Sequence, residues 1–286
     1  DRMVAPTIIG LLVLNIYPFL DTIKLSFSKT LPFGLYELRG LENYIEMFTS
    51  PEFWRANLNT LYFCVLTVPL GLFLSLIVAV MLNAKIKGQT AFRAIFFLPM
   101  VVAPAAVAMV WKWMFNTEYG IINSLLMNKV NWITNPNIVM VTCAIVAIWS
   151  SIGYDAVLLL SGLQNISKSY YEAASLDGAG PVKQFFSITI PIITPTILFN
   201  LITSMISAFQ QLTLVMLLTG GGPLKSTYFY GMFVYDNAFK HHRLGYAASN
   251  AWVMFLIILV LTSVVFKSSD AWVFYESEAG GKKKKG

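Results

Sequence analysis

The chain has 286 residues, of which 57% are hydrophobic and only 12% carry a charge. Soluble domains contain roughly 25% charged residues, so this composition excludes a water-soluble globular enzyme. The net charge of +6 does not indicate a nucleic-acid partner, because four of the positive charges form one terminal run, Lys282 to Lys285. We expect no nucleic acid among its partners and a lipid bilayer around most of its surface.

Long stretches without charged residues recur along the chain. A helix needs about 20 mostly apolar residues to cross a bilayer, and lipid leaves few other ways to satisfy the backbone. Runs such as LGLFLSLIVAVML do not alternate apolar and polar residues as barrel strands do. We therefore predict an all-α membrane protein that forms one transmembrane domain over residues 1–286. Its six spans are expected at about residues 3–27, 56–84, 92–113, 138–163, 188–218 and 244–267.

The distribution of charge between the spans predicts the orientation. Short cytoplasmic loops carry an excess of Lys and Arg. Basic residues without acids lie between the second and third spans, and more follow the sixth: Lys85, Lys87, Arg93, Lys267 and Lys282 to Lys285. Acidic residues gather on the other side: Asp21, Glu37, Glu42, Glu46, Glu52, Glu118 and Asp236. We expect a multi-pass membrane protein with both termini in the cytoplasm.

The candidates for catalytic or metal-binding groups are few. Cys64 and Cys143 both lie in apolar spans, where a thiol usually behaves as a small hydrophobic group. His241 and His242 are adjacent and have no acidic or cysteine neighbour at ligand spacing. The sequence contains no phosphate-binding GxxxxGK[ST] motif. We expect no catalytic residue, no metal and no cofactor held by this chain.

The segment between the fourth and fifth spans, YYEAASLDGAGPVKQFFSITIPIITP, predicts a short helix that ends in a sharp turn. Ala173, Ala174 and Leu176 favour a helix, whereas Gly178, Gly180 and Pro181 stop it. From the residues alone, two interpretations stay open. The helix docks into a groove of another protein, or it is an ordinary interfacial helix at the membrane surface.

The same segment resembles the EAA signature of permease subunits of bacterial binding-protein-dependent carbohydrate importers of the ABC class. The match runs through Glu172-Ala173-Ala174, Asp177 to Gly180 and Ile188 to Pro191, within residues 168–190. Further agreement comes from GLENYIEMF, from FRAIFFLPMVVAPAAVAMVWKWMFN and from LLTGGGP. The last is typical of the F-like member of permease pairs of the maltose, lactose and glycerol-3-phosphate type.

This resemblance implies a type I importer permease fold with a cytoplasmic coupling helix between the fourth and fifth helices. It also implies four kinds of partner: a homologous second permease, two copies of a cytoplasmic ATPase that binds ATP and Mg, an extracytoplasmic sugar-binding protein, and the sugar itself. The chain is then a transporter subunit and not an enzyme. The residues expected to contact the ATPase are Glu172, Ala173, Ala174, Asp177, Gly178 and Gly180.

Polar residues in the fifth span predict a second site. Ser204, Ser207 and Gln211 stand at helical positions i, i+3 and i+7, and a polar group facing lipid is costly. The resemblance adds Ala208 and Thr213 as sugar-contacting positions and Tyr154 as an aromatic one. Asp155 is the one carboxylate well inside a span, which makes it a functional candidate.

Alternatives remain for this second site and for the function. Ser, Thr and Gln also form ordinary hydrogen bonds between membrane helices, and Asp155 either accepts hydrogen bonds from a sugar or pairs with a base of the partner permease. A permease of the same fold for glycerol 3-phosphate, a polyol or another solute is the second functional class. Phosphate recognition would favour Arg or Lys within the spans, which the sequence lacks. A membrane enzyme or ion-coupled carrier is the third class and has no supporting constellation.

Overall fold

A computed structural model describes residues 4–31, 35–84 and 89–274. Lys85, Lys87 and the run Lys282 to Lys285, on which part of the predicted orientation depends, lie outside the described residues. Five helices within the described ranges are long and apolar enough to cross a membrane, or six if a bent pair of helices counts as one span. This arrangement confirms the predicted all-α membrane fold.

The five long spans agree with the runs that lack charge. The first span, Ala5–Ser26, is continuous through α1 (Ala5–Leu11), η1 (Leu12–Ile16) and α2 (Tyr17–Ser26). The second, fourth and sixth spans are single helices: α4 (Pro51–Asn83), α8 (Val139–Gln164) and α14 (Leu244–Ser269). The fifth span, Pro181–Phe209, runs through α10 (Pro181–Gln184), η3 (Phe185–Thr189) and α11 (Ile190–Phe209).

The third span is bent, which differs from the single helix predicted over 92–113. It consists of α5 (Gln89–Val101) and α6 (Pro104–Met114), whose axes meet at 104°. Pro104 begins α6 and holds Ala103 in an extended conformation, with φ −57° and ψ 133°. A proline disfavours helical geometry in the residue before it, so the helix stops and restarts in a new direction.

The fifth span also differs from the prediction, which carried one helix through residues 188–218. Helix α11 ends at Phe209, and α12 (Thr213–Leu218) begins after a non-helical break at residues 210–212. The helical path starts earlier than expected, at Pro181. Gly231 packs on the break: a Cβ atom added there would lie 3.1 Å from the carbonyl oxygen of Gln211.

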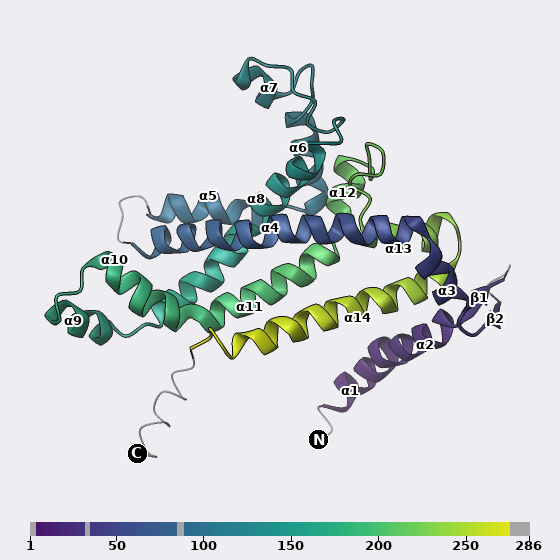
Figure 1. Cartoon of the computed structure of the whole chain (residues 1–286), viewed down its shortest axis with the longest axis horizontal. Coiled ribbons are helices and arrows are strands. Elements are labelled where there is room, and N and C mark those ends of the chain that lie inside the picture. The colour runs from purple at the N-terminus through teal and green to yellow at the C-terminus, as the bar shows by residue number, and fades with distance from the viewer. Residues whose placement is uncertain (1–3, 32–34, 85–88, 275–286) are drawn as a thin grey trace.

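The short elements gather at the two ends of the bundle (Figure 1). One end holds α9 (Lys168–Leu176) and α10. The other holds α3 (Glu42–Thr49), α13 (Tyr230–Tyr235) followed by η4 (Asp236–Lys240), and an unpredicted antiparallel hairpin of β1 (Ser28–Thr30) and β2 (Tyr36–Leu38), in which Ser28 pairs with Leu38. Helix α7 (Ile121–Leu126) lies beyond α6.

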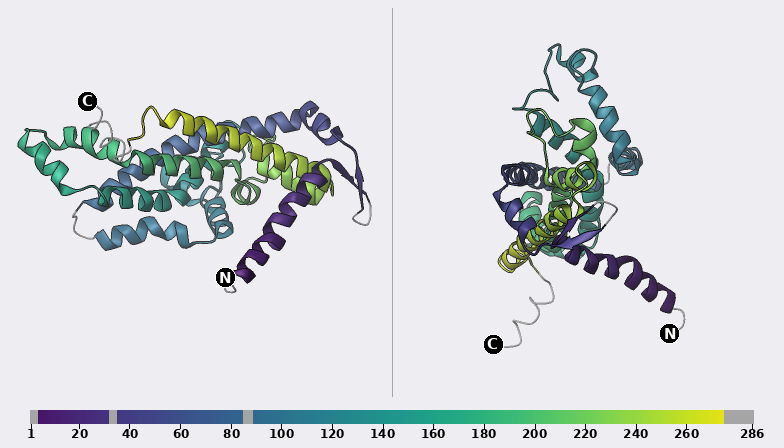
Figure 2. Two further views of the ribbon diagram at one scale, coloured as in Figure 1. Left: turned by 90° about the horizontal axis from the view of Figure 1, so that it is seen from below. Right: turned by 90° about the vertical axis from the view of Figure 1, so that its right-hand side faces the viewer.

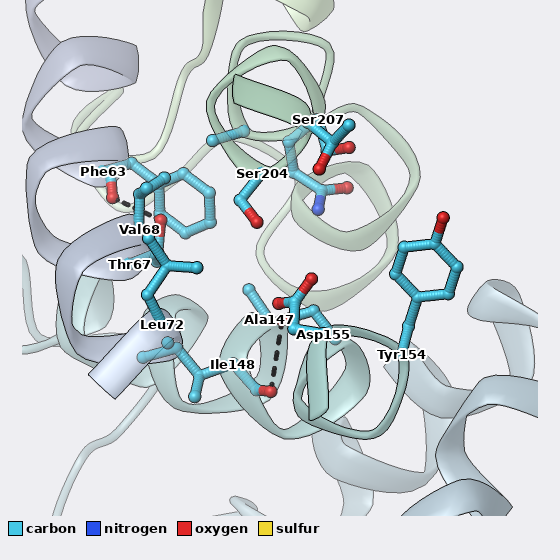
Figure 3. Close-up of a pocket in the computed structure, with 15 residues that line it drawn as sticks. Phe63, Thr67, Val68, Leu72, Ala147, Ile148, Tyr154, Asp155, Ser204 and Ser207 are labelled. Carbon is cyan, nitrogen blue, oxygen red and sulfur yellow. Dashed lines mark hydrogen bonds between the residues drawn. The ribbon is translucent and has the colours of Figure 1, made fainter. Parts of the chain in front are cut away.

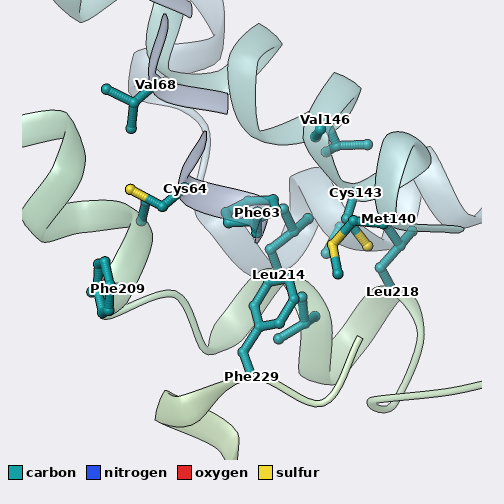
Figure 4. Close-up of a cluster of buried hydrophobic side chains, with 14 of the residues drawn as sticks. Phe63, Cys64, Val68, Met140, Cys143, Val146, Phe209, Leu214, Leu218 and Phe229 are labelled. Atoms are coloured by element: carbon teal, nitrogen blue, oxygen red, sulfur yellow. The ribbon is translucent and has the colours of Figure 1, made fainter. Parts of the chain in front are cut away.

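The main core forms where α4 packs against α8 and α11. Its largest cluster of buried side chains includes Phe63, Phe209 and Phe229, together with both cysteines (Figure 4). Cys64 and Cys143 are free thiols buried in this cluster. They are therefore small apolar packing groups, as the sequence predicted.

The N-terminal helices lie apart from the rest of the bundle. Figure 2 shows α1 and α2 pointing away from the other helices, with contact to α14 made by α2. None of the apolar window of this first span is buried. A helix of this composition needs lipid or another membrane protein around it.

Candidate functional site

A pocket opens between the middle parts of two spanning helices and the C-terminal end of a third (Figure 3). Helices α4, α8 and α11 each supply one wall, and Gln211 follows the end of α11. The lining residues are Phe63, Thr67, Val68, Gly71, Leu72, Ala147, Ile148, Ser151, Tyr154, Asp155, Thr203, Ser204, Ser207, Ala208 and Gln211. Positions near the middle of broken membrane helices are typical of transporter binding sites.

Asp155 lies on the α8 wall and is only 4% exposed. Ser151, one turn earlier on α8, and Ser204 on α11 are its polar neighbours in the pocket. Asn200 on α11 donates through Nδ2 to the backbone oxygen of Asp155 at 3.1 Å. In Figure 3, Asp155 and Ser204 point toward one another. The carboxylate is thus held between two helices.

The structure brings six of the seven predicted pathway residues to this one pocket. Tyr154 and Asp155 come from α8, Ser204, Ser207 and Ala208 come from α11, and Gln211 comes from the break that follows. The seventh, Thr213, lines a neighbouring pocket that shares Ala147, Ser151, Tyr154 and Gln211 with the first. The structure shows that these seven residues lie around two adjoining pockets. Their role in transport stays a prediction.

Gln211 reaches the pocket for a different reason from the predicted one. The spacing of Ser204, Ser207 and Gln211 suggested one helical face, but α11 ends two residues before Gln211. The chain turns at the break, and Gln211 lies against both pockets from there. Discontinuous helices offer unpaired backbone groups as well as side chains at such a point.

Three polar lining residues were not predicted: Thr67, Ser151 and Thr203. Ser151 precedes Asp155 by four residues, so helical spacing on α8 contained a signal for it. Thr67 donates its hydroxyl to the backbone oxygen of Phe63 at 2.8 Å, as threonines in any membrane helix do. Nothing in the sequence of α4 says which of its faces meets α8 and α11.

The chemistry of the pocket suits a polyhydroxy solute. Hydroxyl, amide and carboxylate groups supply donors and acceptors, while Tyr154, at the edge of the pocket in Figure 3, offers an aromatic ring that is 44% exposed. Apolar residues such as Phe63 and Leu72 complete the wall. Sites for small molecules commonly combine an apolar lining with a few placed polar groups.

The second candidate site is the segment from α9 to the start of α11. Ser167 caps α9 by accepting a hydrogen bond from the amide of Ser169. The helix ends at Leu176, and Gly178 then adopts φ +78°, a left-handed conformation that costs glycine least. The predicted short helix and its sharp turn are confirmed at these residues.

The turn is closed by side chains as well as by backbone geometry. Gln184 of α10 donates through Nε2 to the hydroxyl of Ser175 and to the backbone oxygen of Ala179, both at 2.9 Å. Gly180 precedes Pro181 in an ordinary extended conformation, with φ −72°. The two predicted glycines therefore do different things: Gly178 needs its left-handed backbone, and Gly180 does not.

One hydrogen bond ties this turn to the transmembrane bundle. The hydroxyl of Tyr171 on α9 lies 2.9 Å from that of Thr189, the residue before α11. Thr189 is buried, and α11 continues from it toward the pocket. This bond therefore joins α9 to the helix that carries Ser204 and Ser207.

The outer face of α9 is open. Glu172, Ala173 and Asp177 are exposed, and Leu176 exposes 90% of its surface, whereas Ala174 is half-buried. This surface, at one end of the bundle, is available to a partner protein.

Comparison with known proteins adds the family. Residues 71–274 match the sequence pattern described as the inner membrane component of binding-protein-dependent transport systems. The probable ABC transporter permease protein YesP of Bacillus subtilis is 38% identical over 284 residues, which cover 96% of this chain and 91% of YesP. The sulfoquinovosyl glycerol transport system permease protein SmoG of Agrobacterium fabrum is 34% identical and covers 93% and 88%.

Two further proteins extend the comparison. The sn-glycerol-3-phosphate transport system permease protein UgpA of Yersinia pestis is 30% identical, with 96% of this chain and 95% of UgpA covered. A chain in the crystal structure of a bacterial ABC transporter that imports the acidic polysaccharide alginate superposes with a TM-score of 0.83. It is 23% identical and covers 94% of each chain, so it establishes the shared fold alone.

These relatives are named as transport permeases, in agreement with the resemblance that the sequence suggested. The chain is accordingly a multi-pass permease subunit of an ABC transporter and not an enzyme. The match over residues 71–274 includes α9 and most of the residues that line the pocket. The chain belongs to the family of inner membrane components of binding-protein-dependent transport systems.

Proposed function

We propose that this chain forms half of the translocation pathway of an ATP-driven sugar importer, with an oligosaccharide as its natural class of solute. The observation that carries the proposal is the pocket between α4, α8 and α11, where hydroxyls, an amide and a carboxylate face one space. The named substrates of the relatives support a glycoside or a polyhydroxy compound: SmoG is named for sulfoquinovosyl glycerol.

The other half of the pathway is a homologous second permease. The first span is apolar, has none of its window buried and diverges from the bundle in Figure 2, which suits contact with another membrane subunit as well as lipid. Two copies of a cytoplasmic ATPase, with ATP and Mg bound there, supply the energy. An extracytoplasmic binding protein delivers the sugar; a related transporter was crystallised with its periplasmic protein bound to an alginate pentasaccharide.

The coupling role falls to α9 and the turn that follows it. In this proposal the ATPase contacts Glu172, Ala173, Ala174, Asp177, Gly178 and Gly180. When the ATPase dimer closes, it moves α9, and the link between Tyr171 and Thr189 passes the movement to α11. Rigid-body rocking of the two permeases then exposes the pocket to one side of the membrane at a time. The end with α9 faces the cytoplasm of the bacterial cell, as do both termini.

The test is reconstitution of the permease with its partner subunits in liposomes. ATPase activity and uptake are measured with candidate binding proteins loaded with mono- and oligosaccharides, glycerol 3-phosphate and polyols. Stimulation by a loaded sugar is the expected result. Stimulation by glycerol 3-phosphate or a polyol, with every sugar silent, would replace the sugar importer with the alternative permease of the same fold.

Glu172→Ala tests the coupling role in the same system. Loss of the exposed carboxylate removes a charged contact to the ATPase, so we expect uptake to fall about tenfold or more while ATP hydrolysis persists. The exposed Glu118, which pairs with Lys129 in the loop after α6, provides the control Glu118→Ala. Normal uptake by the Glu172 variant, at normal abundance in the membrane, would refute the assignment.

A further inference from the structure

The two adjoining pockets have an unusual charge balance. Among the described residues that line either of them, Asp155 is the single carboxylic acid, and no Lys, Arg or His is present. The pockets share Ala147, Ser151, Tyr154 and Gln211, so a solute in one lies next to the other. A negative charge that enters this space from the solute meets a carboxylate and no base from this chain.

Asp155 is positioned to accept hydrogen bonds from the hydroxyl groups of a solute. A carboxylate has about four acceptor positions, and the polar neighbours of Asp155 in the wall of the pocket are Ser151 and Ser204. Two serine hydroxyls can use at most two of these positions, so others are left to accept hydrogen bonds from a solute. Asn200 on α11 donates to the backbone oxygen of Asp155, and the residue is only 4% exposed, so its carboxylate stays next to a solute in the pocket.

Charge repulsion in such a place is strong. Two like charges a few ångström apart repel far more in a partly buried site than in water, because the protein screens them poorly. Rejection of the wrong solute by an unfavourable contact is a common source of specificity. The same carboxylate that accepts hydrogen bonds from hydroxyls therefore disfavours phosphate, sulfonate and uronate groups.

We infer that Asp155 determines specificity: it selects uncharged saccharides and rejects anionic ones. This inference rests on the proposed sugar-import function and narrows its substrate class. Sn-glycerol 3-phosphate and sulfoquinovosyl glycerol, for which UgpA and SmoG are named, both carry negative charge, so the inference predicts that this chain transports neither.

The experiment compares matched solutes on the complete reconstituted transporter. Uncharged disaccharides, the uronates with the same linkages, and glycerol 3-phosphate are tested by uptake and by equilibrium binding to the purified permease–ATPase complex without binding protein. The binding measurement isolates the permease from the selectivity of the binding protein. We expect at least a tenfold preference for the uncharged member of a pair.

Three variants locate the preference in Asp155. Asp155→Asn keeps the size of the side chain and removes its charge, so binding of the uncharged disaccharide falls and its ratio to the uronate drops by about tenfold. Asp155→Glu restores the charge and is expected to restore the preference. Glu118→Gln removes one negative charge from the exposed pair with Lys129 and leaves the ratio unchanged.

The outcomes separate this inference from the proposed function. Preferred import of a uronate or another anionic saccharide by the unaltered transporter keeps the sugar importer and overturns the role of Asp155. An unchanged ratio in Asp155→Asn overturns it as well. Import of an uncharged polyol, with no saccharide transported, contradicts the sugar importer but agrees with selection against charge by Asp155. Import of glycerol 3-phosphate alone contradicts both the sugar importer and the role of Asp155.

Discussion

Gly178 and Gly180 stand two residues apart in one turn, yet only the first has a conformation that demands glycine. Gly178 has φ +78°, whereas Gly180 has φ −72° and nothing lies within 4 Å of a Cβ atom added at either position. Strain, and not crowding, is therefore the cost of a larger residue at Gly178. The predicted pair thus separates into one residue that shapes the turn and one that precedes Pro181.

We expect Gly178→Ala to strain the turn by about 1 kcal/mol, because an L-residue in the left-handed region pays roughly that amount. The hydrogen bonds of Gln184 then hold α9 less well, and coupled uptake falls. Gly180→Ala is the matched control. Uptake and ATP hydrolysis of the two variants in proteoliposomes are the measurements, and equal effects of both would contradict the distinction.

Gln211 and Gln210 form a similar contrast. Gln211 lines both pockets, whereas Gln210 is exposed and lines neither. A hydrogen bond between a side chain and a solute contributes about 0.5–1.5 kcal/mol. The position after the helix break decides which of the two adjacent amides meets the solute.

Gln211→Leu is expected to lower solute affinity about two- to tenfold or to change selectivity, with assembly of the transporter unchanged. Gln210→Leu serves as the control. Uptake across a panel of sugars, with subunit association checked by co-purification, measures the effect. Identical uptake profiles for the Gln211 variant and the unaltered protein would remove Gln211 from the pathway.

At the scale of elements, interruptions of the helices build the pockets. The bend between α5 and α6 places Pro99 and Pro104 in the wall of the second pocket. The break after α11 brings Gln211 and Thr213 to the same space. Straight helices over 92–113 and 188–218, as the sequence suggested, would close it.

Helix α5 packs closely against α8 next to the pockets. At Gly153 an added Cβ atom would lie 2.1 Å from the backbone oxygen of Phe96, a distance that no structure tolerates without movement of the helices. The neighbouring residues Tyr154 and Asp155 belong to the pocket. The position of α5 is therefore coupled to the geometry of the pathway.

Gly153→Ala should lower the free energy of unfolding by about 1–3 kcal/mol, the usual cost of overpacking. Thermal unfolding of the purified protein in detergent measures this as a lower Tm. Gly10→Ala in α1, where nothing lies within 4 Å, is expected to be neutral or slightly stabilising. A Tm for the Gly153 variant equal to that of the Gly10 variant would argue against the close packing.

At the scale of the molecule, the bundle has two different ends. The turn after α9 and the residues after α14 share one end, since the amide of Phe274 donates to Thr194 near the start of α11 at 2.9 Å. The opposite end carries the β hairpin and the pair between Glu46 and Arg243, whose atoms are 2.5 Å apart. If the first end faces the cytoplasm, ATPase and binding protein approach from opposite sides.

Labelling of cysteines with a membrane-impermeant maleimide tests this orientation. We expect Lys183→Cys to react only in inside-out vesicles and Lys129→Cys only in intact cells or right-side-out vesicles. Both positions are exposed, and the native thiols Cys64 and Cys143 are buried and remain silent. The reverse pattern would invert the proposed topology.

The sequence by itself determined where the chain crosses the membrane and where the turn after α9 forms. Both depend on local properties: a run without charge has to span lipid, and Gly178 followed by Pro181 ends a helix wherever it stands. The resemblance in residues 168–190 led to the family for the same reason, because its signature is continuous in the chain.

Only the tertiary structure decided which helix faces meet. Thr67 and Thr203 look like ordinary threonines of membrane helices until α4, α8 and α11 are packed together. The break before α12 lies against Gly231, a residue further along the chain, so its neighbours could not be read from the local sequence. Apolar composition places a helix in the bilayer, but the direction of its polar residues is fixed by packing against neighbours far along the chain.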